Sequence, residues 1–106
     1  MRRGEVWWAE LPAPAGTRPV VLISRNEAYA VRDLVTVAPV TTRVRRIPTE
    51  VVLGPGEGLP KRCVANVDVI TTIPKGALTR RVSTLTPAKI AAVDRALMFA
   101  LGLSGS

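Results

Sequence analysis

Short apolar runs, separated by turn-forming residues, make up roughly the first two thirds of the chain. The runs are rich in valine, isoleucine and leucine, which suit a pleated surface, and glycine or proline interrupts them. A continuous aliphatic run such as that within 18–24 indicates a strand that is buried on both faces. The pattern predicts strands at 5–11, 18–24, 34–41 and 49–53, and one long or two short strands over 62–73.

The hydrophobic period becomes helical near the end of the chain. Thr86 offers a hydroxyl that can cap a helix, and Pro87 suits the first helical position. Apolar side chains then recur at spacings of three and four, which predicts an amphipathic helix over 87–101 that stops near Gly102. Several short strands followed by one closing helix indicate a mainly β fold with a C-terminal helix. We expect a small, strongly bent β-barrel formed by a single domain over 1–106.

The charge of the chain favours a polyanionic partner. Fifteen lysines and arginines stand against eight acids, a net charge of +7, and both halves of the chain carry the excess. A folded surface of that sign attracts nucleic acid, an anionic membrane or an acidic protein segment. Aromatic residues are scarce, and the neighbours Trp7 and Trp8 must point to opposite faces of the first strand.

The chain lacks the residues that several classes of chemistry require. The chain has no histidine, and its single cysteine, Cys63, excludes an intramolecular disulfide and is expected to be a small buried apolar residue. No metal-ligating cluster, phosphate-binding glycine loop, membrane-length apolar run or signal peptide is evident in the sequence. We therefore expect no metal, no cofactor, no membrane association and a cytoplasmic location. Any enzymatic activity would use metal-free acid–base chemistry.

Arg18 and Thr41 are the strongest candidates for a functional site. Arg18 enters the second predicted strand, and Thr41 and Thr42 end the third, so a cation and two hydroxyls can converge on one patch. Such a patch suits phosphate, because a guanidinium binds two phosphate oxygens and stabilises developing negative charge. A purely structural role is also open. Arg18 would then cover apolar side chains with its stem, and the two threonines would be β-branched residues that end a strand.

Basic residues cluster in the predicted loops, where they form either a solvated rim or contacts with an RNA backbone. These residues are Arg43, Arg45, Arg46, Lys61 and Arg62, followed by Arg80 and Arg81. Asp68 lies within the apolar run 64–73, with Asn66 expected on the same face of the strand. A carboxylate there is either a satisfied buried acid or a proton acceptor whose pKa is set by burial and a nearby arginine.

The chain resembles the MazF/PemK-type toxins, the ribonuclease half of toxin–antitoxin pairs, almost from end to end. The similar segments are Arg3–Trp7, Thr17–Ser24, Val37–Thr41, Asp94–Leu97 and Leu101–Leu103. The resemblance implies an SH3-like barrel of the CcdB/PemK type and a homodimer that cuts single-stranded RNA at short sequences without metal. It also implies attack by the ribose 2′-oxygen on its own phosphate, which leaves a 2′,3′-cyclic phosphate and a free 5′-hydroxyl.

The resemblance assigns roles to three residues. The catalytic arginine of the family falls on Arg18 and its catalytic threonine on Thr41, and in some members a proposed base matches Asp68. Those members carry a second arginine where this chain has Asn66. The loop over 12–17 is shorter than is usual in the family, which bears on substrate coverage and inhibition.

The expected protein partner is a cognate antitoxin whose acidic disordered tail folds over the basic site. Two other functions stay open. One is a non-enzymatic toxin of the same fold that inhibits DNA gyrase, and the other is a basic RNA-binding barrel with evenly spread phosphate contacts.

Overall fold

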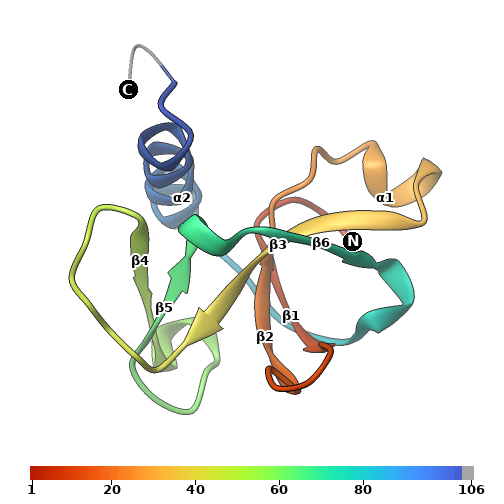
Figure 1. The fold of residues 1–106 in the computed structure, drawn as a ribbon, viewed down its shortest axis with the longest axis horizontal. Helices are drawn as coiled ribbons and strands as arrows, with labels where there is room; N and C mark the ends of the chain where they lie inside the picture. Colours follow the sequence, from red (N-terminus) through yellow and green to blue (C-terminus); the bar gives the residue numbers. More distant parts are fainter. Residues whose placement is uncertain (104–106) are drawn as a thin grey trace.

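The computed structural model describes residues 1–103, so residues 104–106, the last three of the expected domain, lie outside the described part. Figure 1 shows a strongly curled sheet with a long helix on one side. The strands are β1 Glu5–Glu10, β2 Thr17–Leu22, β3 Leu34–Thr41, β4 Glu50–Leu53, β5 Cys63–Asn66, β6 Thr71–Pro74 and β7 Leu78–Thr84. The helices are α1 Ala28–Val31 and α2 Pro87–Ala100, with 3₁₀ helices η1 Pro55–Glu57, η2 Val67–Val69 and η3 Lys75–Ala77.

Strand β3 organises the sheet, because it pairs with three other strands. The strand order is β4-β5-β3-β2-β1-β7, and β6 pairs with β3 outside this path. The first half of β3 pairs with β6, its middle with β2 and its last residues with β5, all antiparallel. The end of β3 therefore leaves β2 and turns toward β5, and this parting of strands creates the candidate site described below. The mainly β fold with a C-terminal helix is confirmed.

Two apolar clusters cover the two faces of the sheet. The alternation of side chains along β2 sends Val21 to the first cluster and Val20 and Leu22 to the second. Strand β2 is thus buried on both faces, as its continuous aliphatic run predicts. The two tryptophans divide in the same way: Trp7 packs against the second cluster, and its register partner is Val20, whereas Trp8 pairs with Pro19.

Helix α2 closes the first cluster through Val93 and Ala96. The Thr86 hydroxyl accepts a hydrogen bond from the Lys89 backbone N–H at 3.2 Å, which satisfies one free donor of the first turn. The chain leaves the helix through Gly102, whose φ of 67° lies in the left-handed region. The predicted helix, its cap and its end are confirmed.

Of the one long or two short strands expected over 62–73, the structure has two short ones, separated by η2. Two other predictions about the second half of the chain are wrong. Asn66 ends β5 and Asp68 lies in a 3₁₀ turn, so they do not lie together in the middle of a strand. The two side chains do not alternate along one strand face: Asn66 is buried and Asp68 is exposed. Strand β7 was not expected, and Arg80 and Arg81 belong to it rather than to a loop. It pairs with β1 at the edge of the sheet.

Candidate nucleic-acid interface

A pocket of about 230 Å³ opens where β3 parts from β2, and we call it the phosphate pocket. Its lining comes from β2, from the end of β3 and the loop after it, from the end of β5 and from η2. The lining residues are Arg18, Pro39, Thr41, Arg43, Arg45, Asn66 and Val69. The structure thus brings Arg18 and Thr41 into one concavity, together with two arginines of the basic loop.

Arg18 lies at the centre of this arrangement and is only half-buried. Its Nε atom is buried, and it has no hydrogen-bond partner among residues 1–103. Buried donors are nearly always satisfied, and leaving one unpaired, above all on a charged group, costs free energy. An anion in the phosphate pocket would supply the missing acceptor, and the planar guanidinium suits a pair of phosphate oxygens.

Thr41 presents the donor side of its hydroxyl to a ligand. The Thr41 Oγ1 atom accepts a hydrogen bond from the Arg43 backbone N–H at 3.1 Å, which fixes the start of the basic loop. A hydroxyl has one donor and two acceptor positions, so this bond leaves the O–H free. A phosphate oxygen in the pocket can therefore receive a hydrogen bond from Thr41.

Asn66 and Asp68 take different positions relative to the pocket. Asn66 lines it, and its Oδ1 accepts from the Asp68 backbone N–H at 3.0 Å, so the amide nitrogen is the end available to a ligand. Asp68 is not part of the lining. Its Oδ2 accepts from the Thr49 hydroxyl at 2.6 Å, and the residue is exposed rather than buried as expected.

A carboxylate that the sequence analysis missed shapes the basic loop between β3 and β4. Glu50 Oε1 accepts from the backbone N–H groups of Arg45 and Arg46, each at 2.9 Å. Arg46 has a φ of 60°, a left-handed conformation that costs energy in a residue other than glycine. The second oxygen, Oε2, is buried and has no partner in residues 1–103. Glu50 thus holds the loop that presents Arg43 and Arg45 to the pocket.

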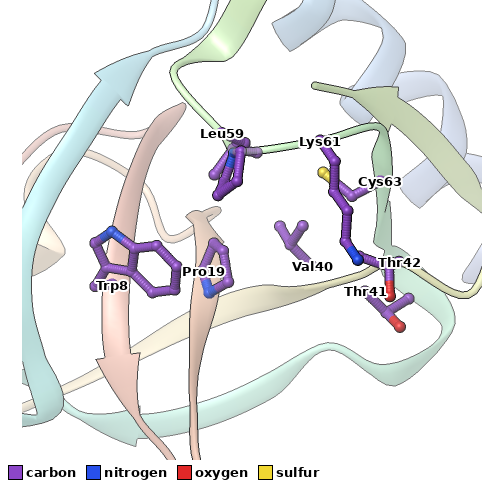
Figure 2. A pocket seen from close by; sticks show the side chains of 9 residues that line it. Trp8, Pro19, Val40, Thr41, Thr42, Leu59, Lys61 and Cys63 are labelled. Carbon is purple, nitrogen blue, oxygen red and sulfur yellow. The ribbon is translucent and has the colours of Figure 1, made fainter. Parts of the chain in front are cut away.

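A second, almost wholly apolar pocket of about 140 Å³ lies beside the first, and Thr41 lines both. Figure 2 shows Trp8 and Pro19 on one side of it and Thr42 and Lys61 on the other. Cys63 lies in its wall and is buried, as expected; burial, with Glu57 adding to it, raises the pKa of the thiol. A protonated thiol in this wall behaves as an apolar group.

The predicted RNA-contacting residues therefore fall into three groups. Arg43, Arg45 and Asn66 line the phosphate pocket, and Thr42 and Lys61 line the apolar pocket beside it. The third group, Arg46 and Arg62, is exposed and lines neither. Pro39 and Val69 also line the phosphate pocket, and nothing in their residue types indicates that role.

Residues 1–103 contain neither a candidate metal site nor a helix that could span a membrane. Among these residues no three His, Cys, Asp or Glu side chains gather in a group that could hold a metal ion. Neither α-helix in this part of the chain has the length and apolar character needed to cross a membrane.

The fold and the pocket define a class: a small basic barrel with a buried arginine Nε that has no hydrogen-bond partner among residues 1–103. The chain belongs to the PemK-like, MazF-like toxins of type II toxin–antitoxin systems, whose family model matches residues 2–101. The family that the sequence resembles is thus confirmed. Among curated relatives, the chain is 39% identical over 103 residues to "Probable endoribonuclease MazF5" of Mycobacterium tuberculosis, covering 96% of this chain and 94% of that protein. It is 33% identical over 115 residues to "Endoribonuclease MazF9" of the same species, covering 97% and 98%.

Solved structures give the same result. The fold is similar to that of the M. tuberculosis toxin MazF-mt6, with a TM-score of 0.88 and 32% identity over 94% of this chain and 98% of that one. It is also similar to a mycobacterial endoribonuclease determined in complex with its cognate antitoxin, with a TM-score of 0.87 and 32% identity. That match covers 100% of this chain and 99% of the other.

Proposed function

We propose that the protein is the toxin of a type II toxin–antitoxin pair and a metal-independent endoribonuclease that cuts single-stranded RNA at selected sequences. The observation that carries the proposal is the buried Nε of Arg18, which has no partner in the described part of the chain and lies in a pocket shared with Thr41. The names of the relatives support it, because both curated proteins compared above are called endoribonucleases.

The proposed reaction is an internal displacement at phosphorus. The ribose 2′-oxygen bonds to the adjacent phosphorus while the bond from phosphorus to the 5′-oxygen breaks, giving a 2′,3′-cyclic phosphate and a 5′-hydroxyl. Arg18 stabilises the negative charge on the non-bridging oxygens, and Thr41 donates a hydrogen bond to one of them. Arginine keeps its proton at any physiological pH, so its contribution is electrostatic, and the departing 5′-oxygen takes its proton from water.

Asp68 is the proposed acceptor of the 2′ proton. Its carboxylate is exposed and lies in η2, the same turn as the pocket-lining Val69. Since Thr49 occupies Oδ2, the acceptor would be Oδ1. The amide nitrogen of Asn66 takes the place of a cation as a donor to the phosphate.

The proposal includes two protein partners: a second copy of the chain, in a homodimer, and a cognate antitoxin. An acidic antitoxin segment suits the phosphate pocket, because its carboxylates would pair with the arginines that also hold RNA. A solved relative in complex with its cognate antitoxin supports this pairing.

The test is cleavage of single-stranded RNA by purified protein in the presence of EDTA, with chemical analysis of the new ends. The proposal expects cyclic phosphate and 5′-hydroxyl ends, and strong loss of cleavage in Arg18→Ala and Thr41→Val. The matched control is Arg80→Ala, which removes an exposed arginine of β7 that does not line the phosphate pocket. Intact RNA across varied sequences, or ends with a 3′-hydroxyl, would refute the proposal. Bound but uncut RNA would favour a basic RNA-binding barrel.

A further inference from the structure

The phosphate pocket continues into a further pocket of about 370 Å³, which we call the neutral pocket. The two share three lining residues, Arg18, Pro39 and Val69, so they form one trough on the same side of β2 and β3. The far walls of the neutral pocket are the loop after β1, which includes Ala15, and strand β6.

The chemistry of the trough changes at Arg18. Among the residues that line the phosphate pocket, Arg18, Arg43 and Arg45 carry charge; among those that line the neutral pocket, only Arg18 does. The remaining residues that line the neutral pocket are apolar, apart from Thr71 and Thr72. A phosphate needs donors and cations, whereas a nucleobase has apolar faces and a polar edge. The mostly apolar lining of the neutral pocket therefore suits a nucleobase better than a phosphate.

The neutral pocket is also formed in advance. Its loop wall is closed by two backbone hydrogen bonds, from Leu11 N to Gly16 O at 3.0 Å and from Ala15 N to Pro12 O at 3.1 Å. The lining residue Ile73 is a buried member of the second apolar cluster. Fixed walls on a packed floor lower the entropic cost of ordering a ligand.

Thr71 supplies a polar group that can distinguish one base from another. Its register partner Val37 belongs to the second apolar cluster, as does Ile73 two residues on, so the Thr71 side chain lies on the face of the sheet that also carries Arg18 and Pro39. Thr72 points to the other face, where its Oγ1 lies 3.2 Å from Oγ1 of its register partner Thr36. The Thr71 hydroxyl has one donor and two acceptor positions for the edge of a base.

We propose that the neutral pocket holds the nucleobase of a nucleotide that adjoins the phosphate at Arg18, and that Thr71 contributes to the base preference at that position. This inference rests on the proposed ribonuclease function and extends it to the selection of the cleavage site.

The first experiment measures binding, so that it does not depend on cleavage. Fluorinating every 2′ position of an oligonucleotide removes the nucleophile, and abasic residues are then introduced one position at a time. We expect one abasic position to weaken binding about tenfold or more, the value of one stacked base. In Ala15→Phe, where a ring fills the neutral pocket, the intact and the abasic oligonucleotides should bind alike. The matched control is Ala88→Phe, at an exposed alanine of α2, which should keep the difference.

The second experiment compares Thr71→Val with Thr84→Val, a substitution at an exposed threonine of β7. Thr71→Val should change kcat/KM about fivefold, the value of one hydrogen bond, for some bases at one position and for none elsewhere. An equal loss on all substrates, or no abasic effect at any position, would overturn the inference even if RNA is cut. An abasic effect that Ala15→Phe abolishes, in a protein that cuts no RNA, would support the pocket and refute the nuclease.

Discussion

Two depressions on this molecule are lined by arginines, and only one of them has the properties of a ligand site. The phosphate pocket has Arg18, Arg43 and Arg45, and a volume of about 230 Å³. A second depression, here called the N-terminal pocket, is larger, at about 610 Å³, and contains Arg3, Arg81 and the exposed Arg2. Size would therefore select the wrong pocket, and the number of arginines would not distinguish the two.

The difference lies in what the arginines already bind. In the N-terminal pocket, Arg3 pairs with Asp94 at 2.7 Å and donates from Nε to the Ile23 carbonyl at 3.1 Å. Arg81 pairs with Glu5 at 3.4 Å. In the phosphate pocket, the Nε of Arg18 has no partner in the described residues, and no acid lines the pocket. An arginine that is satisfied within the chain stabilises the fold, whereas an unsatisfied one is available to a ligand.

The largest expected effect is that of Arg18→Lys on catalysis. Lysine keeps the charge but loses the planar fork that binds two phosphate oxygens. We expect kcat/KM for RNA cleavage to fall by about 10² or more, the cost of removing one preorganised donor at a developing oxyanion. The unfolding midpoint in urea should stay within error of the wild type, because the substitution breaks no hydrogen bond from Nε.

The matched variant in the other pocket is Arg81→Lys, which should leave kcat/KM within about twofold, because its partner Glu5 is structural. Equal losses of activity in the two variants would mean that total charge, and not the state of each arginine, determines the site. The comparison between the two pockets would then fail.

Glu50→Ala should have the next largest effect, because it releases the loop that carries Arg43 and Arg45. We expect KM to rise about tenfold, since two charge-assisted hydrogen bonds to backbone N–H groups are lost and the arginines must be ordered on binding. Glu50→Gln keeps a carbonyl acceptor in place and should stay within about threefold of the wild type. If Gln is as impaired as Ala, Glu50 acts through its charge and not as a loop acceptor.

The sequence predicts the parts of this fold that local pattern controls. The helix after Thr86 and the strand 34–41 were found because capping, period and β-branched runs act over a few neighbouring residues. Strand β7 was missed because Arg80 and Arg81 interrupt its apolar pattern. It lies at the edge of the sheet, where charged side chains are tolerated and protect against unwanted pairing.

In the site, too, only the features that local pattern controls were predictable. The meeting of Arg18 and Thr41 follows from two strand ends, but the relation between Asn66 and Asp68 depends on a 3₁₀ turn that replaces the expected strand. Which arginines are paired with an acid or a carbonyl within the chain was not predictable. Arg3 and Asp94, for example, are paired although they lie at opposite ends of the sequence. Only the packing of α2 beside the first strands determines that pair.

Arg3→Ala should have the opposite effect to Arg18→Lys: it should lower stability and leave RNA cleavage unchanged. Arg3→Ala removes an ion pair with Asp94 and a hydrogen bond to the Ile23 carbonyl. The ion pair is partly exposed, so we expect a loss of about 1–2 kcal/mol in the free energy of unfolding, most of it from the hydrogen bond. The measurement is urea unfolding, with Arg2→Ala, a neighbouring exposed arginine, as the control. A loss of cleavage in folded Arg3→Ala would place the N-terminal pocket in the active site.

The smallest expected effect concerns pH and Glu5. Burial alone would raise the pKa of this carboxyl, but hydrogen bonds led by that from Trp7 Nε1 at 2.9 Å outweigh it, and the pKa is lower than its ordinary 4.5. A carboxyl whose pKa is lower in the folded state stabilises the fold above its unfolded pKa and loses this contribution as pH falls. The difference in unfolding free energy between wild type and Glu5→Gln should therefore be constant near neutrality and shrink below about pH 4.5. Glutamine can still accept from Trp7, so the difference isolates the negative charge of Glu5, which the N-terminal ammonium and Arg81 both stabilise. A difference that stays the same down to pH 3.5 would show that this charge does not stabilise the N-terminal pocket, and the contrast with the phosphate pocket would then rest on Arg3 alone.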